Sequence, residues 1–234
     1  MERILTPERL DGRRPDPLLL RESLADLAWM NRYLGVAGGM GQQLERMVDG
    51  TVHRLRILDV GAGGGDILVA LARWSRRRAI EFQGVAVDRG RPTCRVARAM
   101  TGETGEPHRM RVVCGDALRL PFADRSHDVT VCNTFLHHLE PEQAIQTLRE
   151  MARVSAVGFV VSDLRRGTLG YLASLGLAFT VWARHSYTRH DAQASMRAAF
   201  TLKEARELAD RAGLEAVVEP QPMFRWAMRW KRDR

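Results

Sequence analysis

The chain has 234 residues, 45% hydrophobic and 27% charged, a composition typical of globular proteins that argues against wholesale disorder. This length suits one domain spanning 1–234 with a full core. The formal net charge of +8 suggests a nucleic-acid partner, but Lys203 and Lys231 are the only lysines and the arginines are scattered. Because this pattern indicates a coding bias rather than a phosphate-binding surface, we expect no nucleic-acid partner.

The N-terminal region predicts a helical cap over 1–49. Apolar residues recur at helical spacing over Arg21–Leu34, glycines follow, and a second short helix is expected over Gln42–Val48. The N-terminus shows no apolar signal core, so we expect a cytoplasmic protein.

Residues 50–163 then alternate between strand and helix patterns. This alternation predicts parallel strands joined by helical crossovers. The expected strands are Arg56–Val60, Phe82–Val87, Met110–Cys114, Val129–Asn133 and Val157–Ser162, and the expected helices are Ile67–Trp74, Pro92–Met100 and Pro141–Val154.

The regular alternation ends after the fifth strand. Residues 164–200 predict an insert, formed by an apolar helix over Gly167–Ala183 and a polar stretch rich in His and Arg. The uncharged part of this helix is shorter than a membrane span, so no integral span is expected. Residues 201–234 predict a helix with a capping box from Thr201 to Glu204, then two short strands, Leu214–Val218 and Phe224–Trp230, joined across Pro220 and Pro222.

These elements predict an α/β fold. We expect a Rossmann-like, doubly wound, seven-stranded sheet that is mostly parallel with an antiparallel C-terminal edge strand. Cys94, Cys114 and Cys132 form no CxxC pair and lie in or beside apolar runs, which indicates buried thiols and neither a disulfide framework nor a metal site.

A glycine-rich loop, Gly61–Gly65, joins the first strand to its helix and predicts a nucleotide site. Asp66 stands where a dinucleotide fingerprint would have its third glycine, and its charge would repel a pyrophosphate. Asp59, just before the loop, suits a ligand with a cationic end, such as S-adenosylmethionine. Asp88 and Asp116 stand at the ends of the next two strands. There they could accept hydrogen bonds from the hydroxyls of a ribose and from the amino group of an adenine.

In these residues the chain resembles the class I methyltransferases over roughly 50–165. Asp59 with Gly61, Ala62 and Gly63 matches their first motif, and Asp116–Leu118 matches their adenine-side motif. The resemblance implies that S-adenosylmethionine is the cofactor, with no metal. The cofactor-binding residues that it implies are Asp59, Gly61, Ala62, Gly63, Asp88, Arg89, Asp116, Ala117 and Asn133.

Two adjacent histidines, His137 and His138, follow the fourth strand and are expected beside the transferred methyl group. A histidine can act as a general base when the acceptor is a hydroxyl. Neighbouring side chains do not easily face one cleft together. The His-His-Leu string, common in small-molecule methyltransferases, favours His138 as the base and leaves His137 as the alternative.

The insert resembles small methyltransferases related to quinone-biosynthesis enzymes, some of which are found beside type III polyketide synthases. The strings that carry this resemblance are Asp-Leu-Arg-Arg from Asp163 and His190-Asp191. They imply a substrate or lid role, although a capping or ion-pair network within the insert explains them equally well. The substrate-binding candidates are Asp163, Arg165, Tyr187, His190 and Asp191.

The function that these features favour is O-methylation of a phenolic or polyketide-type hydroxyl in secondary metabolism. C-methylation of a quinol ring is the nearest alternative. An RNA or protein methyltransferase and a non-catalytic S-adenosylmethionine-binding protein are alternatives from other classes. The expected partner is an aromatic or hydrophobic small molecule, and the chain is expected to be a monomer or homodimer.

Overall fold

A computed structural model of the chain describes residues 1–9, 12, 15–48, 52–102, 109–180 and 186–233, without the side chains of 177–180 and 186–189. The helices are α1 (Pro17–Tyr33), α2 (Val36–Glu45), α3 (Asp66–Arg76), α4 (Arg91–Gly102), α5 (Pro141–Val154), α6 (Thr168–Thr180), α7 (Ser186–Ala198) and α8 (Leu202–Ala212), with a 3-10 turn, η2, at Leu136–His138. The strands are β1 (Arg54–Val60), β2 (Glu81–Asp88), β3 (Met110–Cys114), β4 (His127–Asn133), β5 (Ser155–Leu164), β6 (Val217–Gln221) and β7 (Arg225–Lys231).

The seven strands form one sheet in the order β3-β2-β1-β4-β5-β7-β6. β1 to β5 pair in parallel, and β7 pairs antiparallel with both β5 and β6. This confirms the predicted Rossmann-like sheet. The last strand of the chain, β7, lies inside the sheet, and β6 forms the edge.

The predicted boundary of the last hairpin was wrong. The strand expected over Leu214–Val218 begins at Val217 and runs through Pro220 to Gln221. Proline interrupts a central strand because it has no N–H to donate, but an edge strand tolerates it on its unpaired side. Pro220 is therefore part of β6 and does not begin the turn.

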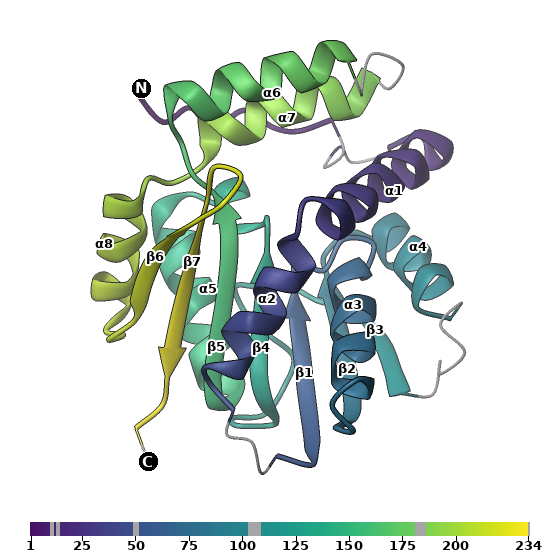
Figure 1. Cartoon of the computed structure of the whole chain (residues 1–234), viewed down its shortest axis with the longest axis vertical. Coiled ribbons are helices and arrows are strands. Elements are labelled where there is room, and N and C mark those ends of the chain that lie inside the picture. Colours follow the sequence, from purple (N-terminus) through teal and green to yellow (C-terminus); the bar gives the residue numbers. More distant parts are fainter. Residues whose placement is uncertain (10–11, 13–14, 49–51, 103–108, 181–185, 234) are drawn as a thin grey trace.

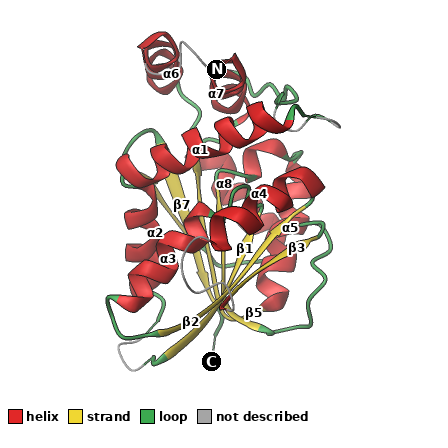
Figure 2. Ribbon diagram, turned by 90° about the vertical axis from the view of Figure 1, so that its right-hand side faces the viewer, coloured by secondary structure: helices red, strands yellow, loops and turns green. Residues whose placement is uncertain are grey.

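Helices cover both faces of the sheet, as the edge-on view in Figure 2 shows. On one face, α2 and α3 pack against β1, β2 and β4 through Leu44, Leu68 and Leu71. On the other face, α5 and α8 pack against β4, β5 and β7 through Leu148 and Leu208. The two buried apolar layers fix the sheet, so the carboxyl ends of the parallel strands form one rigid edge.

Three helices lie across that edge. Figure 1 shows α6 and α7 side by side above the carboxyl ends of β4 and β5, with α1 passing beneath them. The polar half of the insert, predicted without a helix, includes α7. No helix in the described part of the chain is long and apolar enough to cross a bilayer.

Candidate active site

The loop between β1 and α3 runs with its glycines in the left-handed region. Gly61, Gly63 and Gly65 have φ of 69°, 52° and 76°. Residues other than glycine adopt such backbone angles only with steric strain. A Cβ on Gly61 would lie 2.3 Å from the ring of Phe135. The loop therefore stays thin enough for a ligand to approach its backbone, with Phe135 packed against it.

Asp59 is the most strongly perturbed acid at this loop. It is 1% exposed, and its Oδ2 has no hydrogen-bond partner among the described residues. Burial, followed by the charges of Asp66 and Asp88, raises the pKa of Asp59 well above its ordinary value. A buried carboxylate in this position needs a cation to balance it. The sulfonium and ammonium groups of S-adenosylmethionine fit that need.

The other predicted cofactor residues lie at the same edge. Asp88 accepts from the backbone N–H of Gly63 at 3.1 Å and from that of Gly90 at 2.8 Å. Asp116, exposed after β3, accepts from the N–H of Leu118 at 3.0 Å. Ala62 and Ala117 are buried, whereas the side chain of Arg89 is exposed.

Helix α1 closes over the glycine loop through Asn31. Its Nδ2 donates to Oδ2 of Asp66 at 3.0 Å, and its Oδ1 lies 3.5 Å from Nδ2 of Asn133. Asn31 therefore joins the start of α3 to the end of β4, the two sides of the expected donor site.

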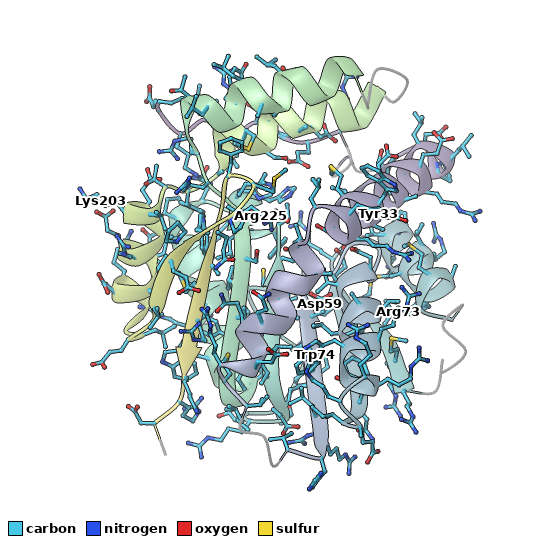
Figure 3. All side chains as sticks on the ribbon, in the orientation of Figure 1. Tyr33, Asp59, Arg73, Trp74, Lys203 and Arg225 are labelled. Atoms are coloured by element: carbon cyan, nitrogen blue, oxygen red, sulfur yellow. The ribbon has the colours of Figure 1, made fainter. Side chains whose placement is uncertain are left out.

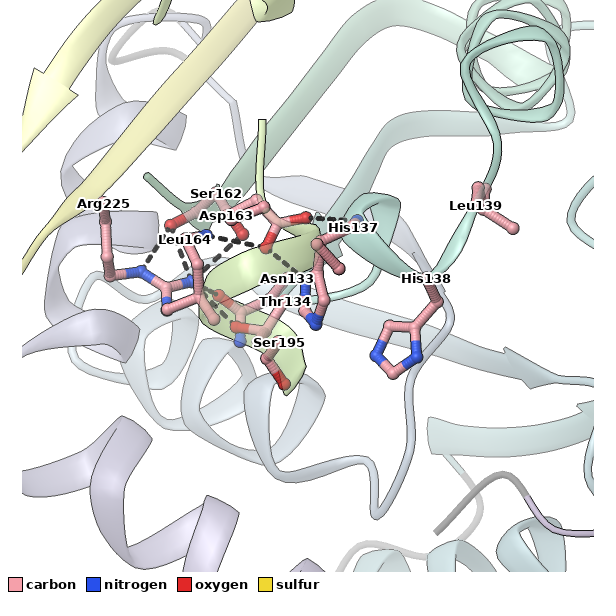
Figure 4. A network of polar contacts seen from close by, with 12 residues as sticks. Asn133, Thr134, His137, His138, Leu139, Ser162, Asp163, Leu164, Ser195 and Arg225 are labelled. Atoms are coloured by element: carbon pink, nitrogen blue, oxygen red, sulfur yellow. Dashed lines mark hydrogen bonds and ion pairs between the residues drawn. The ribbon is translucent and has the colours of Figure 1, made fainter. Parts of the chain in front are cut away.

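His137 is buried in an ion-paired network at the turn after β4 (Figure 4). Its Nδ1 lies 2.7 Å from Oδ1 of Asp163, and its backbone N–H donates to Oδ2 of the same residue at 3.1 Å. Burial lowers the pKa of His137, but the charge and hydrogen bond of Asp163, helped by Glu8, outweigh it and raise the pKa to about 10. His137 is consequently a protonated structural partner of Asp163 at neutral pH.

His138 is the more accessible of the two histidines, with its side chain 21% exposed. Its ring stacks near Phe135, with centroids 6.2 Å apart. Its Nε2 lies 3.8 Å from Oε2 of Glu8.

Glu8 is a site residue that the sequence did not reveal. The first nine residues lie against η2 and α7, where Arg3 donates to the carbonyl of Leu139 at 2.7 Å and the N–H of Arg9 donates to Asp191 at 3.0 Å. Glu8 accepts from the hydroxyl of Ser195, and its Oε1 lies 3.5 Å from Nε2 of His137. A lone acid in a polar arm gives no periodic signal that could have predicted this contact.

Glu8, His137 and His138 bring their possible metal-ligand atoms within 4.8 Å of one another. A metal needs an imidazole nitrogen with a free lone pair. The pKa of His137 is raised to about 10 by Asp163 and Glu8, so a metal ion would have to displace a proton from this ring.

An apolar cavity of about 180 Å³ lies beneath α6 and α7. Leu27 and Met30 of α1, Ala173 of α6 and Met196 of α7 are among its walls. Its polar lining includes Glu8, Asn31, Thr134, Asp191 and Arg225. A second cavity, of about 350 Å³, lies between α2 and the β6–β7 hairpin and shares Leu34, Val36 and Arg225 with the first.

Of the predicted substrate residues, Asp191 alone is among the residues lining either cavity in the described part of the chain. Asp163 is paired with His137 beneath the cavity floor, and Arg165 donates its backbone N–H to Phe224 at 2.7 Å. His190 is exposed and lies 3.0 Å from Asp191. The side chain of Tyr187 lies outside the described residues.

Arg225 was also missed by the sequence prediction, although it lines both cavities. Its position in the apolar run Phe224–Met228 is the signal that could have revealed it, because a charge on an inward-facing strand position is unusual. Figure 3 places Arg225 and Asp59 within the body of the protein, whereas Lys203 extends outward from α8.

Residues 57–158 match a family described as a methyltransferase domain. These residues therefore form a methyltransferase domain within the chain. The cofactor of this domain is S-adenosylmethionine, in agreement with the buried, uncompensated Asp59.

Relatives of this methyltransferase domain come from several bacteria. The chain is 36% identical over 112 residues to a demethylmenaquinone methyltransferase of Roseiflexus sp. (strain RS-1), covering 47% of this chain and 42% of that protein. It is 32% identical over 140 residues to the methyltransferase GfsG of Streptomyces halstedii, covering 56% and 48%. The chain thus spans less than half the length of these curated relatives.

The fold of the chain is shared with solved structures. An S-adenosylmethionine-dependent methyltransferase from Aquifex aeolicus superposes with a TM-score of 0.61 at 13% identity, covering 93% of this chain and 99% of that one. Among the described residues that line the 180 Å³ cavity, only Thr134 lies within the matched range 57–158. The matched range therefore contains the glycine loop and its acids, whereas other segments form most of the cavity wall.

Proposed function

We propose that this chain is an S-adenosylmethionine-dependent O-methyltransferase acting on a hydroxyl of an aromatic or otherwise apolar small molecule, such as a phenolic polyketide. The observation that carries the proposal is the 180 Å³ cavity. Its apolar walls suit such a body, and it is lined by Asn31 and Thr134 at the donor edge and by the carboxylate of Glu8.

When bound, S-adenosylmethionine supplies an electrophilic methyl group. Asp59, Asp66 and Asp88 would hold its charged and ribose ends against the glycine loop. Methyl transfer is an in-line displacement, so the main task of the protein is to align the acceptor oxygen with that group. The walls contributed by α1, α6 and α7 would hold the acceptor and exclude water.

The acceptor hydroxyl must lose a proton as the new C–O bond forms. Glu8 faces the cavity, and its second oxygen lies 3.8 Å from Nε2 of His138. In the proposed step Glu8 accepts the hydroxyl proton, and His138, as the nearby base, receives it and returns it to solvent. His137 assists indirectly, because its protonated ring holds Glu8 and Asp163 in position.

C-methylation of a quinol ring is the second candidate. It is favoured by the identity of 36% to the demethylmenaquinone methyltransferase of Roseiflexus. An activated ring carbon would occupy the same place as the hydroxyl oxygen, and the same residues would take the ring proton after methyl transfer.

A screen with isotopically labelled methyl donor tests both candidates. Phenols, phenolic polyketides and quinols are supplied separately, and the position of the label in each product is mapped by mass spectrometry and NMR. Label on oxygen supports the first candidate and label on a ring carbon the second. Labelled protein or RNA in place of any small molecule would refute both.

A further inference from the structure

Arg225 is the first residue of β7 and follows a turn with an unusual backbone conformation. The preceding residues, Met223 and Phe224, have φ of 58° and 54°, in the left-handed region that bulky residues avoid. The backbone N–H of Arg165 donates to the carbonyl of Phe224 at 2.7 Å and holds the turn in place. This conformation puts Arg225, which is 7% exposed, in the walls of both cavities.

Five hydrogen bonds fix one side of this guanidinium (Figure 4). Nη2 donates to Oδ1 of Asn133 at 2.7 Å, to Oγ1 of Thr134 at 2.8 Å and to the carbonyl and hydroxyl oxygens of Ser162 at 3.1 and 3.2 Å. Nε also approaches the Ser162 hydroxyl, at 3.3 Å. The fork is therefore immobile before any ligand binds.

The remaining nitrogen, Nη1, donates to no residue in the described part of the chain. Nη1 is also not one of the side-chain atoms that are fully buried and lack a hydrogen-bond partner. Arg225 lines both cavities, and Nη1 is the guanidinium nitrogen that acceptors in the described part of the chain leave available. A ligand atom that accepts both would complete the hydrogen bonding of Arg225.

Arg225 has no carboxylate of its own among the described residues. Asp163 is the carboxylate that acts on Arg225, and the same carboxylate is already paired with the protonated His137 at 2.7 Å. Glu8 and Asp191, the other acids of the cavity, are engaged by Ser195 and by the N–H of Arg9.

We propose that Arg225 binds, through Nη1, an oxyanion that the aromatic acceptor carries in addition to the hydroxyl that is methylated, either a second, ionised phenol or a carboxylate. The proposal rests on the proposed function, because it assumes that the 180 Å³ cavity is the acceptor site. Guanidinium groups bind oxyanions by charge-assisted hydrogen bonds that are stronger than those to neutral groups. Apolar residues such as Leu27, Met30 and Met196 would contact the ring. Arg225 is thus a specificity-determining residue that selects ionised aromatic acceptors over neutral ones.

The test measures binding, without methyl transfer, to the full chain saturated with S-adenosylhomocysteine. The probes are 4-nitrophenolate, benzoate and the uncharged 4-nitroanisole, titrated at a pH where the phenol is ionised. In Arg225→Met the affinity for both anions should fall at least about tenfold, while the affinity for 4-nitroanisole changes by less than about twofold. The anion that binds the wild-type protein more tightly identifies phenolate or carboxylate as the preferred group.

Two further variants keep the result interpretable. Arg225→Lys retains the charge without the fork, so its anion affinity should lie between those of the wild type and Arg225→Met. Ser162→Ala removes a hydroxyl that supports Arg225 but leaves Nη1 in place, so its selectivity for anions should persist.

Equal losses for the anions and 4-nitroanisole in Arg225→Met and Arg225→Lys would show that Arg225 only supports the cavity wall and would overturn the proposal. Absence of anion binding by the wild-type protein would also overturn it. Anion binding that depends on Arg225, in a protein that methylates none of the screened acceptors, would instead count against the proposed function alone.

Discussion

His137 binds Asp163 twice, through Nδ1 at 2.7 Å and through its backbone N–H at 3.1 Å. The pairing joins the turn after β4 to the end of β5 inside the protein. Because Asp163 also acts on Arg225, this single carboxylate compensates only part of the charge of two buried cations.

Asp163→Asn should be strongly destabilising. The substitution leaves two buried cations without their carboxylate, and breaking such a pair costs roughly 3–5 kcal/mol. Urea unfolding followed by tryptophan fluorescence at neutral pH measures the loss. Asp124→Asn serves as the control, because Asp124 pairs with Arg153 at an exposed position. A similar small effect for both variants would contradict the expectation.

The His137–Asp163 pair also predicts a pH dependence of stability. The pKa of His137 is raised from 6.5 to about 10, so its contribution is complete below pH 6.5 and is lost as the pH rises through about 10. The pKa of Asp163 is lowered, so its contribution is present above its ordinary value of 3.8 and is lost as the pH falls through the folded value. Denaturation midpoints across this range should therefore decline at both ends, and His137→Gln should flatten the alkaline decline.

Asp59→Asn should have opposite effects on the free and the donor-bound protein. Burial and the charges of Asp66 and Asp88 raise the pKa of Asp59, so its ionisation above the ordinary value of 3.8 opposes folding. The amide removes that charge and should raise the melting temperature of the free protein at neutral pH. It should also weaken S-adenosylmethionine binding, by about tenfold or more, because a charge-assisted contact is lost. Thermal unfolding with and without the donor measures both, and a drop in stability without donor would refute the explanation.

Gly61→Ala should abolish donor binding. The added methyl group meets the Phe135 ring at 2.3 Å and the residue keeps a φ of 69°, so the loop must move. Calorimetry with S-adenosylhomocysteine gives the affinity. Gly176→Ala is the matched control, because no atom lies within 4 Å of its added Cβ and it sits inside α6. That control should retain donor binding, and its free energy of unfolding should rise by about 0.5–1 kcal/mol because alanine favours a helix more than glycine does.

Glu8→Gln should reduce turnover of a hydroxyl acceptor by about a hundredfold, the usual size of a general-base contribution. Affinity for S-adenosylmethionine should be unchanged, since Glu8 contacts η2 and α7 and does not contact the glycine loop. Glu2→Gln, an exposed acid in the same arm, is the control. Turnover at the wild-type rate in Glu8→Gln would exclude Glu8 as the proton acceptor.

The donor half of the molecule was predictable because its signals are local. Buried strands, glycines and the acids Asp59 and Asp88 follow one another within a few residues, and parallel pairing brings the strand ends together. The bounds of the first strand of the last hairpin were mispredicted, because a proline such as Pro220 ends most strands but is tolerated in the edge strand β6.

The acceptor half was much less predictable. Glu8 precedes every regular element, and Arg225 stands near the other end of the chain, yet both line the same cavity. Their proximity arises from packing between segments distant in sequence, which periodicity does not record. The two histidines illustrate the same limit. They are neighbours in sequence, and only the folded structure shows that His137 is buried against Asp163 whereas His138 is partly exposed.

Among the described residues, the walls of the 180 Å³ cavity come from 8–36, 164–196 and 223–225, with Thr134 alone from the matched range. The molecule is therefore divided into parts that can change separately. Substitutions in α1, α6, α7 or the β6–β7 turn can reshape the acceptor site while the glycine loop and its acids remain intact. Related chains can therefore keep one donor chemistry and diverge in acceptor, and exchanging those four segments between relatives is a direct route to new substrate ranges.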